Sequence, residues 1–210
     1  MFLACGMTLV IMLGGIDLSV GSVIAMVGCF AAGFISYLGL PSGAAILLAI
    51  LLGACLGLFN GAVAAFTTIP PFIITLATMN IGRGIARVYS ATKTITVSDS
   101  FFKSIAATYV GPIPIQVIYI VIVVALTAVI LNRTQLGRHI LATGGNMQAA
   151  AYSGVNTKVV TLFVFVYSSI LASLAGIISS SRLFSGTHTA GESAEMDAIA
   201  AVVLGGTSMA

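Results

Sequence analysis

Residues 132–158 read NRTQLGRHILATGGNMQAAAYSGVNTK and form the longest polar interruption of an otherwise apolar chain. On both sides of it lie apolar runs that are long enough to cross a bilayer. The interruption carries Arg133, Arg138, His139 and Lys158, and it carries no acid. An excess of Lys and Arg is typical of cytoplasmic loops, so we expect this segment on the cytoplasmic side of a membrane protein.

The middle of this segment predicts a short helix. Gly144 and Gly145 interrupt the chain, Asn146 is a favourable N-cap, and Gly154 can end the helix in a left-handed conformation. A helix over 147–153 is too short to be stable alone in water, where about 12–15 residues are needed. Either it docks on a soluble motor subunit, or the segment is an ordinary basic loop that only anchors the topology.

Composition assigns the class of protein. Hydrophobic residues make up 59% of the chain and charged residues only 6%, whereas an ordinary soluble domain is about 25% charged. The chain therefore needs lipid as its solvent. A net charge of +3, spread over scattered basic residues, does not favour a nucleic-acid partner. The three cysteines lie in apolar runs without metal-ligand spacing, so we expect neither a disulfide framework nor a metal site.

The apolar runs predict an all-α fold, a polytopic transmembrane helical bundle. Two further runs, 1–13 and 198–204, are too short to cross alone, and the second is either a half-helix or the start of a span, stopped by 205–208. Counting spans places 38–43, 89–114 and 182–197 outside, with 67–71 and 132–158 inside. The expected spans are 18–37, 44–66, 72–89, 115–131 and 159–181.

Small residues recur on one face of the span 44–66. Gly53, Gly57 and Gly61 are each four residues apart, and such a face lets two helix backbones approach closely in lipid. We therefore expect this face to pack against another helix. Asn60 lies beside it and can hydrogen-bond across the contact.

Polar residues in the spans are candidates for a translocation path. Asp17 is either the N-cap of the helix that follows it or a group on the solute path, because ionisable groups at membrane depth are usually functional. Thr75, Thr78 and Asn80 either line a polar passage or bond to neighbouring helices. With Asn60, these residues make up the candidate path.

Several functions are excluded by absent motifs. The sequence has no GxxxxGK[ST] loop for ATP and no clustered catalytic set, so we do not expect an enzyme. Ion-driven carriers usually hold ionisable residues along the midplane, whereas the spans here offer little beyond Asp17, Arg83 and Arg87. We expect a passage that receives energy from a partner through 132–158. A secondary transporter and a structural membrane scaffold are the alternatives.

Four stretches, in order and over nearly the whole chain, resemble the permease subunits of bacterial ABC importers for ribose, xylose, arabinose and related sugars. The branched-chain amino-acid permeases share the broad fold, and GGIDLSVGS is typical of the sugar type. The stretches are GGIDLSVGS at 14–22, LGLFNGAVAAFTTIPPFIITLATMNIGRG at 56–84, LGRHILATGGNMQAAAYSGVNTK at 136–158 and AGESAEMDAIAAVVLGGTS at 190–208.

The resemblance implies an importer in the inner membrane. A second permease copy, two ATP-binding subunits and a periplasmic sugar-binding protein would be its partners, and ATP would be bound by the partner, so the chain itself needs no cofactor. The outer loops, including 184–195, would face the binding protein. The solute would be a ribose-like monosaccharide or, as an alternative, another small solute such as a branched-chain amino acid.

The resemblance also assigns the coupling to the ATPase. The chain would be one permease domain, 1–210, incomplete at both ends, with 132–158 as its cytoplasmic coupling loop. A full member would have one more helix before Met1 and further helices after Ala210. The coupling helix would run from Gly145 to Gly154. The residues expected to face a groove of the ATPase are Asn146, Gln148, Ala149, Ala150 and Ser153.

Overall fold

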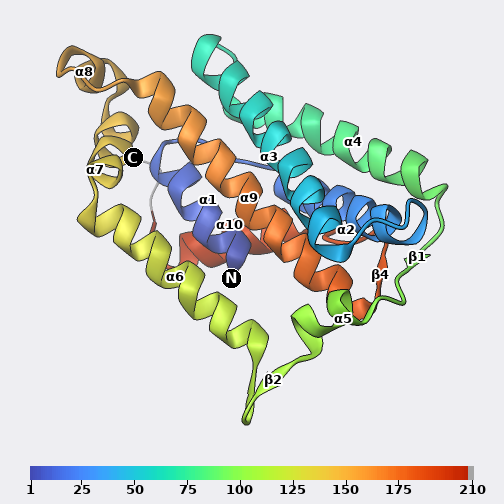
Figure 1. Cartoon of the computed structure of the whole chain (residues 1–210). Coiled ribbons are helices and arrows are strands. Elements are labelled where there is room, and N and C mark those ends of the chain that lie inside the picture. Colours follow the sequence, from blue (N-terminus) through green and yellow to red (C-terminus); the bar gives the residue numbers. More distant parts are fainter. Residues whose placement is uncertain (208–210) are drawn as a thin grey trace.

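Helices make up nearly all of the regular structure. The computed structural model describes residues 1–207, in which ten helices and four two-residue strands form (Figure 1). This confirms the expected all-α class. The helices are α1 Phe2–Met12, α2 Val20–Ser36, α3 Ser42–Phe66, α4 Pro71–Ser90, α5 Ser100–Ala107, α6 Ile115–Arg133, α7 Gln135–Gly145, α8 Met147–Tyr152, α9 Thr157–Leu183 and α10 Ala194–Leu204.

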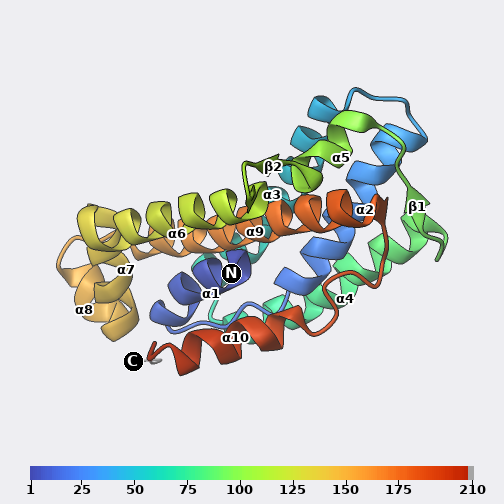
Figure 2. The ribbon, with the colours of Figure 1, turned by 90° about the horizontal axis from the view of Figure 1, so that it is seen from below.

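The longest helix, α9, occupies the centre of the bundle, with α3, α2 and α1 packed around it (Figures 1 and 2). Three helices, α3, α6 and α9, are long and apolar enough to cross a membrane. Helix α6 is much less buried than α9, since only Val123 and Thr127 of its own residues are buried. A helix that is apolar all round but little buried needs lipid or protein against its free face.

Helices α3 and α9 pack closely along a face of small residues. A Cβ added at Gly57 would lie 2.6 Å from the Cβ of Ser169 and 2.7 Å from the carbonyl oxygen of Phe165. Gly53 lies against the hydroxyl of Ser173, and Gly61 lies against the backbone of α9. The glycine face of α3 therefore leaves no room for any side chain, and the two backbones pack directly.

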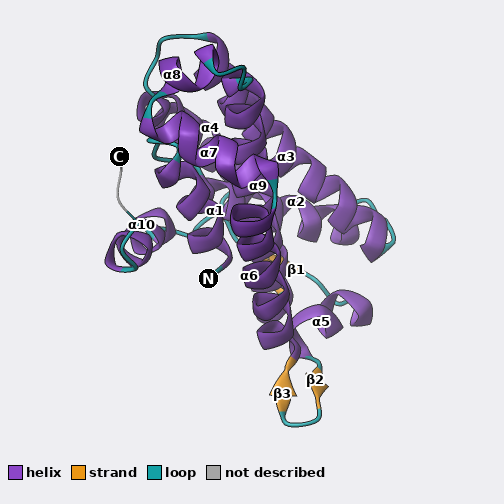
Figure 3. Cartoon of the chain, turned by 90° about the vertical axis from the view of Figure 1, so that its left-hand side faces the viewer, coloured by secondary structure: helices purple, strands orange, loops and turns teal. Residues whose placement is uncertain are grey.

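The connections gather at two opposite ends of the bundle, which we call the α8 end and the α5 end (Figure 3). At the α8 end the ammonium group of Lys158 lies 4.9 Å from the ring centroid of Phe66, so 67–71 and 132–158 share this end. At the α5 end the Ser42 hydroxyl donates to the carboxylate of Asp99 at 2.6 Å, which joins 38–43 to 89–114. The arrangement follows the alternation that counting spans predicts.

Short strands fasten the α5 end. Strand β1 (Ile95–Thr96) pairs antiparallel with β4 (Ser185–Gly186), and β2 (Tyr109–Val110) pairs antiparallel with β3 (Ile113–Pro114). Asp99 caps α5 by accepting from the N–H of Phe102 at 2.7 Å. The hydroxyl of Ser42 and this N–H hold the pKa of Asp99 below its usual range, so the carboxylate is charged and fully engaged.

One local expectation, that Asp17 is the N-cap of the helix after it, was wrong. The N-cap of α2 is Ser19 and not Asp17, because the Asp17 carboxylate accepts from the N–H of Ser19 two residues on and the helix begins only at Val20. Helix α7 runs through Gly144 and Gly145 and ends there, and α8 begins after Asn146, so the chain is interrupted where the glycine pair predicts.

The segment 184–193 does not stay at the α5 end. It runs back along α2, where Gly186 lies against the carbonyl of Gly28 and Gly191 lies against the carbonyl of Gly21. Helix α10 then follows against α1 and α2 (Figure 2). Its 11 residues extend about 16 Å, which is about half of a bilayer core. Its C-cap is Gly205, and Ser208 of the expected stop lies outside the described residues.

The contact between α3 and α9 predicts a contrast between two glycine-to-alanine changes. Gly57→Ala forces a methyl group into the Phe165 carbonyl and should cost about 1–3 kcal/mol of stability by overpacking. Gly84→Ala in α4 meets nothing within 4 Å and should be neutral or stabilising by up to about 1 kcal/mol. Thermal unfolding of the detergent-solubilised protein measures both. Equal melting temperatures for the two variants would contradict the packing described.

Candidate functional site

Helix α8 projects at one end of the molecule, away from the hairpin of β2 and β3 (Figure 3). The side chain of Asn146 caps it by accepting from the N–H of Ala149 at 2.9 Å. After the helix, Gly154 adopts a φ of +85°, a left-handed conformation that glycine reaches without strain. The N–H of Val155 then donates to the carbonyl of Ala150 at 3.1 Å. Six helical residues are thus held by caps at both ends.

One expected contact residue of α8 faces inward. Ala150 is only 4% exposed, so it packs against its own chain and is not free to enter a groove on a partner. The other residues assigned to the coupling helix are exposed: Gly145, Asn146, Gln148, Ala149, Ser153 and Gly154. Two exposed apolar side chains that the sequence reading missed lie beside them, Tyr152 at 91% and Met147 at 51%. Large apolar side chains within a polar segment were the signal in the sequence that could have identified both as contact residues.

Helix α7 connects α8 to the core. It buries Gly137, Ile140 and Thr143, which share one side of the helix at a spacing of three. Gly144 touches the carbonyl oxygen of Met12 at the end of α1, at a distance that admits no side chain. Its neighbour Gly145 has nothing within 4 Å of the position that a Cβ would take. A displacement of α8 and α7 would therefore press directly on the end of α1.

A second group of polar residues lies buried where α1 turns into α2. The carboxylate of Asp17 accepts from the Ser19 hydroxyl at 2.6 Å and from the Ser168 hydroxyl of α9 at 3.1 Å. The amide of Asn60 on α3 donates to the Ser19 hydroxyl at 3.0 Å. We call these four residues the Asp17 cluster. All are at most 1% exposed, so three separate segments meet in this cluster, two of them directly on the carboxylate and α3 through the Ser19 hydroxyl.

The Asp17 cluster lies near the midplane of the bundle. Ser168 is 11 residues into α9, which places it about 16 Å along the helix and close to the middle of a bilayer core of about 30 Å. The Oδ1 atom of Asn60 and the hydroxyl of Ser169 are buried without a hydrogen-bond partner among the described residues. The cluster can thus accept further hydrogen bonds from hydroxyl groups, the chemistry that a sugar presents.

The candidate path residues do not all meet. Thr75 lies next to the cluster, since its hydroxyl donates to the carbonyl of Ile16 at 3.1 Å. Thr78 is buried and lines an apolar hollow of about 450 Å³ between α2, α3 and α4. Asn80 is exposed and donates to the carbonyl of Leu76 in its own helix at 3.0 Å. The structure brings Asp17, Asn60 and Thr75 together, whereas Thr78 and Asn80 lie apart.

Arg83 has a role that the sequence reading did not assign. Its guanidinium donates to the carbonyl of His188 at 2.9 Å and to the carbonyl of Ala190 at 2.7 Å. It thereby fixes the returning segment 184–193 against α4 and α2, and it satisfies backbone groups that lipid cannot. The signal in the sequence was an arginine inside an apolar helix.

Over residues 1–207 no group of three or more His, Cys, Asp or Glu side chains is placed to hold a metal ion. Cys5, Cys29 and Cys55 are free thiols.

Comparison with known proteins gives one family. The family model for the branched-chain amino acid transport system / permease component matches residues 1–210. The chain is 46% identical to the ribose import permease protein of Haemophilus influenzae and 42% identical to that of Bacillus subtilis, over 99% of this chain and 65% of each relative. It is 41% identical to the D-allose transport system permease protein of Escherichia coli, over 94% of this chain and 61% of the relative. No solved structure matches.

The hydrogen bonds of the Asp17 cluster predict that the carboxylate holds the α1–α2 turn to α9. Asp17→Ala leaves the N–H and hydroxyl of Ser19 and the hydroxyl of Ser168 without their acceptor, and should cost about 1–3 kcal/mol. Ser168→Ala removes one donor and leaves the carboxylate two others, so its cost should be clearly smaller. Chemical denaturation in detergent measures both, and a Ser168→Ala cost that equals the Asp17→Ala cost would contradict the assignment.

Proposed function

The chain belongs to the family of branched-chain amino acid transport system permease components, and we propose from this premise that it is the transmembrane subunit of an ATP-driven importer for a ribose-like monosaccharide. The relatives named above support the sugar class, although the chain spans only about 65% of the length of the first of them. The observation that carries the proposal is α8, a capped and exposed six-residue helix at one end of a multi-pass bundle.

In this proposal α8 docks in a groove of an ATP-hydrolysing subunit on the cytoplasmic side. The small side chain of Ala149 lets a groove close around the helix. The side chains of Gln148 and Ser153 can form hydrogen bonds with the groove. Tyr152 and Met147 supply the apolar area, since aromatic residues and methionine are enriched at the centres of protein interfaces. The residue Ala150 contributes by holding α8 on its own chain.

We further propose how the docking helix acts on the path. Closure of the ATPase subunits moves α8, and α7 passes this motion to α1 through the contact between Gly144 and the Met12 carbonyl. The end of α1 leads within five residues to Asp17, whose cluster joins α9 and α3. A shift of this segment rearranges the hydrogen bonds at the midplane. Asp17, Asn60 and Thr75 are then the residues that meet the solute, and Thr78 and Asn80 belong to the path only in another state.

The remaining partners follow from the same class. A second permease copy would complete the passage, and a sugar-binding protein would deliver the solute at the α5 end, which lies in the periplasm of the proposed inner-membrane protein. Of the segment 184–193, only its start in β4 lies at this end, where its pairing with β1 offers the binding protein a fixed surface.

Docking of α8 predicts the effect of a bulky charge at its tip. Ala149→Arg should abolish ATP-driven uptake into vesicles that hold the complete importer, while the variant inserts and folds as the parent does. The control Ala142→Arg places the same side chain at an exposed position of α7 and should leave uptake near normal. Normal uptake with Ala149→Arg would refute the docking, and uptake without ATPase subunits would favour a secondary transporter.

The contact between α7 and α1 predicts different outcomes for two adjacent glycines. Gly144→Ala drives a methyl group into the Met12 carbonyl and should lower the amount of sugar imported per ATP hydrolysed, whereas Gly145→Ala meets open space and should not. Both changes raise helix propensity by about 1 kcal/mol, so propensity is matched. Uptake and ATP hydrolysis are measured in the same vesicles. A Gly144→Ala loss that only follows the amount of folded protein would contradict the coupling route.

A further inference from the structure

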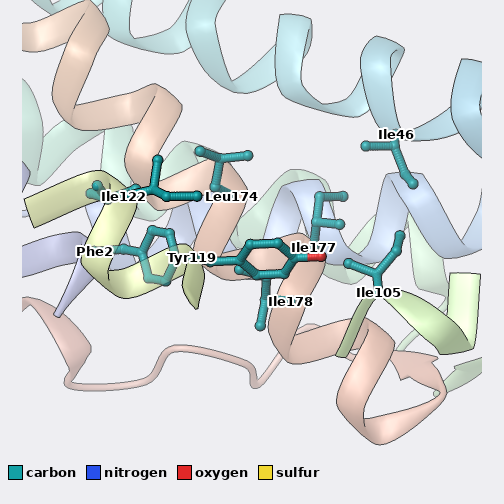
Figure 4. Close-up of a pocket in the computed structure, with 9 residues that line it drawn as sticks. Phe2, Ile46, Ile105, Tyr119, Ile122, Leu174, Ile177 and Ile178 are labelled. Atoms are coloured by element: carbon teal, nitrogen blue, oxygen red, sulfur yellow. The ribbon is translucent and has the colours of Figure 1, made fainter. Parts of the chain in front are cut away.

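A slot opens between α6 and α9, in the first half of α6 (Figure 4). Its volume is about 270 Å³, and its walls come from α1, α3, α5, α6 and α9. The Tyr119 ring lies across it among isoleucine side chains, including Ile105 and Ile177 (Figure 4). Among residues 1–207, those that line it carry no charge. The lining residues are Phe2, Ile46, Ile105, Tyr119, Ile122, Val123, Leu174, Ile177 and Ile178.

Two polar contacts hold α6 at a fixed distance from α9. In its second half, the hydroxyls of Thr127 and Tyr167 share a hydrogen bond of 2.7 Å. At its start, the amide of Gln116 donates to the carbonyl of Ala106 in α5 at 3.0 Å. Helix α5 is in turn fixed to α9, because the Ser181 hydroxyl donates to the carbonyl of Phe102 at 2.6 Å. The slot lies between these contacts, so it cannot close by a simple collapse of α6.

A polar hollow lies one helical turn beyond the slot toward the α5 end. Its lining includes Gln116 and Arg182. On α6, Gln116 is three residues from Tyr119 of the slot, and on α9, Arg182 is four residues from Ile178. Residues at these spacings lie on the same side of a helix. The hollow therefore lies directly beyond the slot on the same sides of α6 and α9, and together they present an apolar interior and a basic mouth.

Arg182 supplies the charge at this mouth. Within residues 1–207, Arg182 is exposed and makes neither an ion pair nor a side-chain hydrogen bond. Asp99, the acid at the start of α5, is already engaged, because it accepts from the hydroxyl of Ser42 and from the N–H of Phe102. A guanidinium presents a planar pair of donors that suits a phosphate group.

The dimensions of the site match one leaflet of a membrane. From Arg182 to Leu174, the deepest slot residue on α9, is eight residues, or about 12 Å along the helix. Half of a bilayer core is about 15 Å. A group bound at Arg182 would lie at the interface, and a chain in the slot would end near the midplane.

We propose that this site binds an anionic phospholipid, with the phosphate on Arg182 and Gln116 and one acyl chain in the slot beneath Tyr119. A helix from another protein or from a second copy does not fit, since a helix with its side chains is about 10–12 Å wide and α6 is fixed to its neighbours on both sides of the slot. The bound chain fills the gap and holds α6, the helix that leads into α7, in place. The lipid is thus a ligand of the bundle and not only its solvent.

The test places the protein in vesicles of phosphatidylglycerol and phosphatidylethanolamine. In one set of vesicles the phosphatidylglycerol carries a photoreactive acyl chain, and in the other set the phosphatidylethanolamine does. Ile178→Trp fills the slot, so the acyl chain can no longer enter it. Labelling of the α6 and α9 peptides at the slot should fall by about tenfold, which corresponds to a loss of about 1.4 kcal/mol of binding free energy. The control Val166→Trp places the same ring in a different hollow of α9 and should leave this labelling unchanged. Equal labelling in the Ile178→Trp variant would overturn the proposal.

A second pair of variants tests the charge. Arg182→Gln should reduce a preference for phosphatidylglycerol over phosphatidylethanolamine by about tenfold, as expected for the loss of a charge-assisted contact. Arg138→Gln, at the α8 end, should not change it. An unchanged preference in Arg182→Gln would overturn the phosphate assignment, and labelled peptides of a second copy at the slot would show a protein occupant instead. Neither readout depends on uptake, so the result stands apart from the proposed function.

Discussion

The bundle depends on the direct backbone contact between α3 and α9. Lipid is as apolar as the helices themselves, so burial of apolar surface supplies little drive for helices to associate in a membrane. Packing must supply it, and packing is best where the backbones approach most closely. Gly57 and its neighbours on α3 provide that approach, and Ser169 and Ser173 on α9 fill the remaining space. The Asp17 cluster, which joins the same two helices, can only form at this separation.

The contact also explains why a carboxylate can lie at the midplane. An isolated charge is expensive there, but Asp17 lies among hydroxyl donors from the α1–α2 turn and from α9. The turn itself is at the end of α1, against which α7 rests through Gly144. One chain of contacts thus runs from the exposed α8 to the centre of the bundle. In the proposed importer this chain carries the motion of the ATPase to the path.

Much of this arrangement could be predicted from local sequence. The five apolar runs predicted helices α2, α3, α4, α6 and α9, of which α3, α6 and α9 are long and apolar enough to cross a membrane. The Asn146 cap and the left-handed Gly154 predicted α8. These signals depend on neighbouring residues alone. Other features depend on distant parts of the chain. Gly144 is needed because Met12 lies against it, and nothing near Gly144 in sequence says so. The inward face of Ala150 and the return of 184–193 along α2 are set by tertiary contacts of the same kind.

Crosslinking from α8 tests the central claim most directly. A photoreactive amino acid at position 152, where Tyr152 is 91% exposed, should capture the ATP-hydrolysing subunit in intact membranes. The same group at position 150, where Ala150 is 4% exposed, should react only within the chain itself. Capture of the ATPase from position 152 alone is the result that the account predicts. No capture from position 152, or equal capture from both positions, would contradict it.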